Sequence, residues 1–135
     1  MRNLTVTATL ANSITSAAIV NEGTLSLINS TFSDNHIGQG STIYNRSGGT
    51  LTVTNSTFSA NVYQGNFPGV VPTDHGGILN DGTLSVTAST FSFNQGAIGN
   101  RGALSVTGTT FSGNRAAISN SGTFAIVTES TFSDN

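Results

Sequence analysis

The chain has 135 residues and a formal net charge of −2, with only 7% of its residues charged. Four arginines without lysine are too few to create the positive field that concentrates nucleic acid. Cysteine is absent, which excludes disulfides and thiolate metal sites, and no apolar run reaches the length of a membrane-spanning helix. We therefore predict one domain over residues 1–135, with no nucleic-acid partner, membrane-spanning segment, metal or cofactor.

The chain opens on a segment, residues 1–7, that alternates like a β-strand. Thr5 and Thr7 are expected on the outer side of this strand. Leu10 and Asn12 then stand where later repeats have Phe and Asn, so we interpret this first stretch as a degenerate, cap-like repeat.

A repeat with three elements follows. A Leu-x-Leu or Leu-x-Val strand is followed by Phe seven residues after its first Leu, then by Asn three residues later, and then by Ile two residues before a second Asn. The basic period is about 20 residues, as from Leu84 to Leu104 and from Leu104 to Phe124. Such short, β-rich segments, broken by Gly and Asn, predict strands and turns with no helix.

Three strand faces per repeat predict an all-β fold: a triangular parallel β-solenoid of about six stacked coils. On each of the three strand faces the large apolar residues are expected to point inward, and Gly or Asn is expected at the corners. The predicted core is Leu25, Phe32, Ile43, Leu51, Phe58, Ile78, Leu84, Phe91, Ile98, Leu104, Phe111, Ile118 and Phe132.

Stacking in register also places equivalent asparagines above one another, where each amide can donate a hydrogen bond to the next. Two such ladders are predicted. They consist of Asn35, Asn61, Asn94, Asn114 and Asn135, and of Asn21, Asn45, Asn80, Asn100 and Asn120.

The repeat that begins at Leu51 and ends before Leu84 is the longest, which predicts an inserted corner loop over residues 62–75. The preceding repeat is lengthened at the same corner. The two longer corners should therefore form one protrusion, whose candidate binding site is His36, Tyr63, Phe67, Asp74 and His75. The alternative is that the loop folds back onto the flank of the solenoid. His36, Asp74 and His75 lack the spacing of known zinc sites, so no metal is assigned.

The outward hydroxyls of the first strand of each repeat form a second candidate surface, with the spacing of an ice-binding face. They are Thr5, Thr7, Thr52, Thr54, Ser85, Thr87, Ser105 and Thr107, a row interrupted at Ser26 and Ile28 and ended by Ala125 and Val127. Ordinary β-propensity of threonine is the alternative explanation.

Catalysis is not expected. Carbohydrate-active β-helices need acidic groups that converge on one face. The six acids here fall mostly at different corners, and Asp34 and Asp134 share a corner but lie four coils apart. A carbohydrate-binding or carbohydrate-active β-helix stays open as an alternative.

The repeats resemble those of polymorphic outer membrane proteins, which pair a Gly-Gly-Ala-Ile element with Phe-x-x-Asn. Gly76-Gly77-Ile78, Gly96-Ala97-Ile98 and Ala116-Ala117-Ile118 match the first element, and the Phe-x-x-Asn segments match the second. The resemblance implies a right-handed parallel β-helix of an extracellular or bacterial cell-surface protein with an adhesive or structural role. Because no polar cap follows Asn135, we expect either a fragment of a longer repeat protein or a unit that associates end to end, with a surface or glycan ligand.

Overall fold

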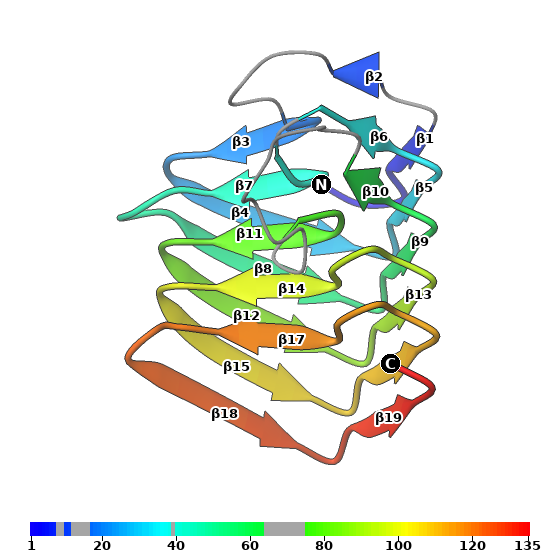
Figure 1. The fold of residues 1–135 in the computed structure, drawn as a ribbon. Coiled ribbons are helices and arrows are strands. Elements are labelled where there is room, and N and C mark those ends of the chain that lie inside the picture. The colour runs from blue at the N-terminus through cyan, green and yellow to red at the C-terminus, as the bar shows by residue number, and fades with distance from the viewer. Residues whose placement is uncertain (8–9, 12–16, 39, 64–74) are drawn as a thin grey trace.

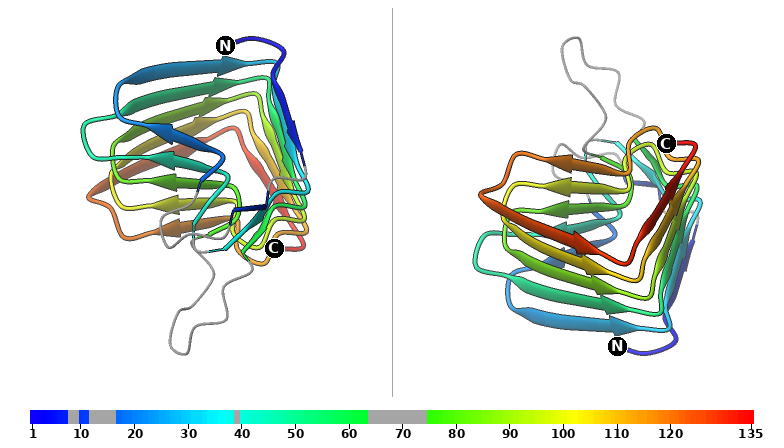
Figure 2. Two further views of the ribbon diagram at one scale, coloured as in Figure 1. Left: turned by 90° about the horizontal axis from the view of Figure 1, so that it is seen from above. Right: turned by 90° about the horizontal axis from the view of Figure 1, so that it is seen from below.

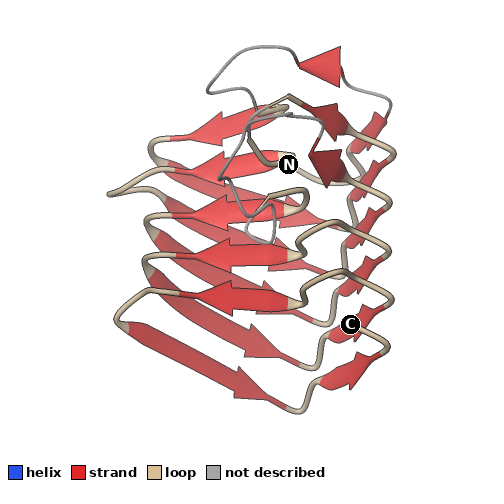
Figure 3. Ribbon diagram, viewed as in Figure 1, coloured by secondary structure: helices blue, strands red, loops and turns tan. Residues whose placement is uncertain are grey.

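The computed structural model describes residues 1–7, 10–11, 17–38, 40–63 and 75–135. These residues form a parallel β-solenoid in which each coil passes through the same sheets as the coil before it (Figure 1). Every pairing between strands is parallel, and the described residues contain strands, turns and loops without a helix (Figure 3). The predicted fold class is therefore confirmed.

Three sheets form the walls of the solenoid. Sheet A contains β4 (Thr24–Ile28), β8 (Thr50–Thr54), β12 (Thr83–Thr87), β15 (Ala103–Thr107) and β18 (Phe124–Thr128). Sheet B contains β1 (Thr5–Thr7), β5 (Thr31–Ser33), β9 (Thr57–Ser59), β13 (Thr90–Ser92), β16 (Thr110–Ser112) and β19 (Thr131–Ser133). Sheet D contains β3 (Ile19–Asn21), β7 (Ile43–Asn45), β11 (Ile78–Asn80), β14 (Ile98–Asn100) and β17 (Ile118–Asn120).

A short fourth sheet, sheet C, lies between sheets B and D near the N-terminal end. Its strands are β2 (Leu10–Ala11), β6 (His36–Ile37) and β10 (Val62–Tyr63). The repeat pattern did not predict this sheet. Its very short strands carry no repeated signature, and they occur only in the coils that are longer than the basic repeat.

The hand of the solenoid follows from the direction of its strands. Seen from the N-terminal end, the chain runs along sheet A, then sheet B, then sheet D, and turns clockwise while it recedes from the viewer (Figure 2). This is the hand of a right-handed helix. The first and last coils lie at opposite ends of the axis.

Like residues meet along the axis because the coils stack in register. Phe58 pairs with Phe32 and with Phe91 on its two sides, and Leu84 pairs with Leu51 and Leu104 in the same way. The rings of the phenylalanine column are stacked at centroid distances of 4.7 to 5.2 Å. The column is dry, since Phe32, Phe58, Phe91 and Phe111 are fully buried.

The ends of the core are less buried than the middle. Leu25 and Ile118 are only half-buried, and Phe132 is 48% exposed although it stacks on Phe111. Placing Phe132 in the core was therefore wrong for this chain, because the last coil has a neighbour on one side only.

The first coil differs from its prediction. Val6, rather than Leu10, occupies the phenylalanine position, because β1 pairs with β5 so that Val6 lies opposite Phe32. Thr5 and Thr7 therefore lie in sheet B, opposite Thr31 and Ser33, and not beside Thr52 and Thr54 of sheet A. Residues 1–3 lie along β4 instead, through an isolated bridge between Arg2 and Ile28.

The last coil is shifted by one residue from its prediction. Ala125 pairs with Leu104, and Phe124 pairs with Ala103, so this repeat is one residue longer than the repeat before it. Alternation along β18 then puts Ala125 and Val127 on the inner side of the strand, and Ile126 continues the outer column of Ser105. Ala125 and Val127 thus do not end the outer row.

The two asparagine ladders run as predicted. In the first, the Nδ2 group of each residue donates to the Oδ1 atom of the next, from Asn35 to Asn135, at 2.8 to 3.0 Å. In the second, from Asn21 to Asn120, every step is 2.7 Å. The same amides donate to backbone carbonyls, as Asn94 does to Phe58, so the ladders also pair buried polar groups of the corners.

Candidate functional site

The outer face of sheet B carries an uninterrupted double column of hydroxyls. Each strand has the form Thr-x-Ser, or Thr-x-Thr in β1, and its middle residue points inward. Alternation therefore turns the two flanking hydroxyls outward in all six coils. We call these residues the hydroxyl array: Thr5, Thr31, Thr57, Thr90, Thr110 and Thr131 in one column, and Thr7, Ser33, Ser59, Ser92, Ser112 and Ser133 in the other.

The fold makes little use of these hydroxyls. Every side chain of the array is exposed or half-exposed. Among the described residues, the single hydrogen bond made by an array hydroxyl joins Ser33 Oγ to Thr7 Oγ1, at 3.2 Å. The remaining hydroxyls are available to solvent or to a ligand.

A second hydroxyl column, one residue before the array, behaves in the opposite way. It consists of Ser30, Ser56, Ser89, Thr109 and Ser130, and all but Ser130 are buried. Each hydroxyl donates to the carbonyl two residues earlier and accepts a backbone N–H from the preceding coil, as Ser89 does with Thr87 and Ser56. This ladder was not predicted from the sequence, although the Ser or Thr before each Thr-Phe-Ser strand is its signal.

Both borders of the array are corners with left-handed backbone. On the side of sheet A they are Asn3, Asn29, Asn55, Ala88, Gly108 and Glu129, with φ between 48° and 58°. On the other side they are Asp34, Ala60, Phe93, Gly113 and Asp134, with φ between 52° and 61°. Asn, Asp and Gly are common in this region, whereas a bulky aromatic residue such as Phe93 is an outlier.

Phe93 is the most exposed large apolar side chain of the chain's described part, at 70%. Its ring lies over Gly113 in the next coil, where an added Cβ atom would come within 2.7 Å of Phe93 Cε1. Gly113 thus provides both the left-handed backbone and the room for the ring. Phe93 was not predicted as a site residue, because it falls outside the repeated Phe position.

The face predicted for ice binding is less regular than the array. In sheet A the outer columns contain Thr52, Ser85 and Ser105, and Thr54, Thr87 and Thr107, as predicted. Ile28 and Ile126 occupy the ends of these columns. Thr5 and Thr7 belong to the array of sheet B, as described above.

The predicted loop site is divided between described and undescribed residues. Tyr63 lies in β10 and is buried. His36 lies in the neighbouring strand β6, where it pairs with Val62 of β10. The rings of Tyr63 and His75 meet edge to face with centroids 5.3 Å apart, and the buried Nδ1 atom of His75 finds no hydrogen-bond partner among the described residues. Phe67 and Asp74 lie outside the described residues.

Charged side chains gather at the corner between sheets D and A, one residue after the second asparagine ladder. Going down the axis, the column reads Glu22, Arg46, Asp81, Arg101 and Ser121, so the sign alternates from coil to coil. Arg46 pairs with Glu22 at 2.6 Å, and Arg101 approaches Asp81 at 3.8 Å.

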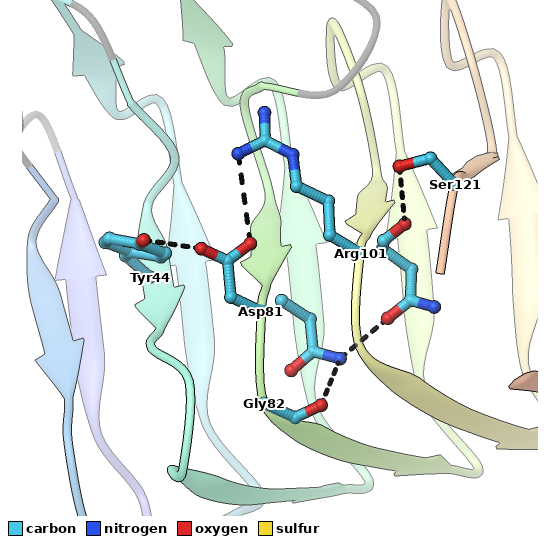
Figure 4. A network of polar contacts seen from close by, with 7 residues as sticks. Tyr44, Asp81, Gly82, Arg101 and Ser121 are labelled. Atoms are coloured by element: carbon cyan, nitrogen blue, oxygen red, sulfur yellow. Dashed lines mark hydrogen bonds and ion pairs between the residues drawn. The ribbon is translucent and has the colours of Figure 1, made fainter. Parts of the chain in front are cut away.

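Tyr44 joins this column to the face of sheet D. Its hydroxyl donates to Asp81 Oδ2 at 2.6 Å, beside the contact between Asp81 and Arg101 (Figure 4). The hydrogen bond to Asp81, followed by desolvation, raises the pKa of Tyr44. Most of these polar groups contact one another across neighbouring coils, while the buried Oδ1 atom of Asp81 accepts no hydrogen bond from the described residues.

Close stacking at the same corner requires the glycine that restarts each of the later repeats, whereas Gly23 of the first has open space around it. A Cβ atom on Gly102 would overlap the carbonyl oxygen of Gly82, and one on Gly122 would overlap that of Gly102. Neither glycine has a positive φ. Glycine is required here by the approach of one coil to the next.

The described residues contain no group of three or more His, Cys, Asp or Glu side chains that could hold a metal ion. A membrane-spanning helix is likewise not found among these residues. A scan against protein-family models gives no match, and neither curated proteins nor solved structures provide a relative of this chain.

Proposed function

We propose that this chain is a rigid segment of an extracellular or cell-surface protein that attaches to a surface ligand through the outer side of its solenoid. The observation that carries this proposal is the hydroxyl array, a regular outer face in six coils that the fold does not need. The resemblance to polymorphic outer membrane protein repeats supports an adhesive or structural role at a bacterial surface.

The acidic residues favour binding over catalysis. Asp34 and Asp134 occupy the same corner column, separated by four coils, which is roughly 19 Å at the spacing of parallel strands. Glycosidases place their two carboxyl groups about 5 to 10 Å apart. Asp81, a third described acid, is engaged by Tyr44 and lies at the corner between sheets D and A.

Attachment is tested with beads that carry the chain at one terminus, passed over surfaces coated with host matrix proteins, with polysaccharides or with whole cells. We expect retention on at least one surface. Beads that carry Phe91→Ala, which disrupts the core, should be lost from that surface. Retention of neither bead on any surface, with the wild-type chain shown to be folded, overturns the proposal.

The last coil supports a second part of the proposal, association between copies. β17, β18 and β19 are edge strands of their sheets in this chain, and the half-exposed ring of Phe132 continues the phenylalanine column. Exposed strand edges are templates for pairing with another chain. Sedimentation velocity should show concentration-dependent association that Phe132→Asp reduces, and a monomer at every concentration contradicts it.

A further inference from the structure

Phe93 places a bulky aromatic side chain at a corner whose left-handed backbone recurs from coil to coil, and the fold does not explain this choice of residue. It holds a left-handed backbone at φ 55°, and it exposes 70% of an aromatic side chain. Strained residues persist where the surrounding structure holds them in place, and they gather at binding sites. Here the backbone N–H of Phe93 donates to the carbonyl of Ser112 at 3.0 Å, which fixes the corner to the next coil.

Small residues surround the ring and leave it accessible. In its own corner column Phe93 lies between Ala60 and Gly113. Across the array, the facing corners of the same two coils are Ala88 and Gly108. Among these corner positions, Phe93 is therefore the one large side chain.

Four outward hydroxyls lie on sheet B in the coils of Phe93 and Gly113. They belong to Thr90 and Ser92 of β13 and to Thr110 and Ser112 of β16, which pair directly. No hydrogen bond joins any of these hydroxyls to the chain's described residues, and each can act as donor or acceptor. We call Thr90, Ser92, Phe93, Thr110 and Ser112 the Phe93 patch.

The chemistry of the Phe93 patch matches that of a neutral sugar. An aromatic ring offers an apolar surface for the C–H face of a pyranose, and hydroxyls that act both as donor and acceptor fit its equatorial hydroxyl groups. The patch itself holds no charge, and the acids of its corner column, Asp34 and Asp134, lie two coils or more from Phe93. The exposed basic residue Arg115 lies two residues beyond Gly113, and its backbone N–H donates to the carbonyl of Asn94, the residue after Phe93.

The hydroxyl array extends the patch along the axis. Successive coils repeat the same pair of hydroxyls, with the phenylalanine column fixing the coil spacing near 5 Å. A ligand that itself repeats can use several coils, which a single sugar cannot.

We propose that the Phe93 patch, with the hydroxyl array beside it, binds a neutral polysaccharide chain. The sugar ring stacks on Phe93, and the hydroxyls of β13 and β16 bond to the sugar on the adjoining surface. This inference rests on the proposed attachment function and names its ligand class.

The experiment is co-sedimentation of the chain with microcrystalline cellulose, with chitin and with an insoluble β-1,3-glucan. Two variants remove the patch: Phe93→Gly, and a four-hydroxyl variant with Thr90→Val, Ser92→Ala, Thr110→Val and Ser112→Ala. A matched control, Ser85→Ala with Ser105→Ala, removes the same kind of hydroxyl from the outer face of sheet A. Melting curves verify that each variant is folded.

We expect wild-type chain and control to bind at least one neutral polysaccharide, and both patch variants to bind it at least tenfold more weakly. Equal binding by wild type and both variants overturns the inference. In a parallel assay with calcium gels of the acidic polysaccharides alginate and polygalacturonate, binding to these gels alone also overturns it. Thermal hysteresis without polysaccharide binding overturns it in favour of ice. Beads retained on protein or cell surfaces, without binding to any neutral polysaccharide, leave the attachment function standing and reject its assignment to this patch.

Discussion

The two sides of sheet B repeat with the same period for different reasons. The inner side is a stack of buried phenylalanines whose rings lie 4.7 to 5.2 Å apart. The outer side is a double column of exposed hydroxyls that, with the exception of Ser33 and Thr7, make no hydrogen bond to the described chain. Packing explains why the buried phenylalanines repeat, whereas nothing in the fold requires the exposed hydroxyls to repeat.

The comparison shows that regularity alone does not separate structural residues from functional ones in a solenoid. Ser89 and Ser92 lie three residues apart, and both belong to columns that repeat from coil to coil. Ser89 is buried and bonded to Ser56 and Thr87, while Ser92 is half-exposed and unbonded within the described chain. Burial and hydrogen bonding distinguish a residue that holds the coils together from one that is free to bind.

The largest effect is expected on the inner side. Phe91→Ala leaves a cavity in the middle of the stack, between Phe58 and Phe111, and should lower the free energy of unfolding by about 3–5 kcal/mol. Chemical denaturation measures this loss. Phe132→Ala is the matched control at the half-exposed end of the same column, and its cost should be clearly smaller; equal costs would contradict the burial of the column.

The asparagine ladder comes next. Asn94→Ala removes the acceptor of the Asn61 amide groups and the donor to the Phe58 carbonyl. Each buried group left unpaired costs about 1–3 kcal/mol, and because the vacated space admits water we expect a total loss of roughly 2–4 kcal/mol. Asn135→Ala, at the end of the ladder, should cost less in the same denaturation assay. A tolerated Asn94→Ala would show that the ladder is dispensable.

Removing the Phe93 side chain at the border of the array should raise the free energy of unfolding instead of lowering it. Phe93→Gly relieves a left-handed conformation and should raise stability by about 1 kcal/mol while it weakens polysaccharide binding. Gly113→Ala should destabilise, since its Cβ would meet the Phe93 ring and its φ is 61°. A loss of stability in Phe93→Gly would indicate that the ring serves the fold, which would remove the argument for its function.

The smallest effect concerns the hydrogen bond between Tyr44 and Asp81. The hydrogen bond to Asp81 raises the folded-state pKa of Tyr44 above its unfolded value. The associated stabilisation is therefore complete below the unfolded pKa, about 10, and is lost as the pH rises through the folded pKa. In a Tyr63→Phe background, the tyrosinate absorbance should titrate above this value and return towards it in Asp81→Asn. Identical midpoints would show that the pair does not persist in solution.

Much of the fold was predictable because its inner columns use distinctive residues. Phe-x-x-Asn and Ile-x-Asn recur with few substitutions, so the pairing of Phe58 with Phe91 and of Asn45 with Asn80 follows from alignment. The first and last coils were misaligned where a substitution removed the signal. Val6 replaces phenylalanine in β1, and Phe124 stands one residue before the position of Leu104.

The candidate site was harder to predict than the core. Thr and Ser are frequent throughout the chain, and only the structure separates the buried Ser89 column from the exposed Ser92 column. Phe93 looked like a variable corner residue because its backbone conformation and the ring's position over Gly113 cannot be read from the residue types. Sequence patterns reveal which residues repeat, but they do not show which hydroxyls the fold has already bonded.

The most direct measurement compares the free energy of unfolding of the four-hydroxyl variant of β13 and β16 with that of Phe91→Ala. Because exposed, unbonded side chains contribute little, we predict that the four-hydroxyl variant stays within about 1 kcal/mol of the wild-type chain while Phe91→Ala loses several times as much. If removing the four outer hydroxyls destabilises the chain as much as Phe91→Ala does, the array belongs to the scaffold and the division between the two sides of sheet B is wrong.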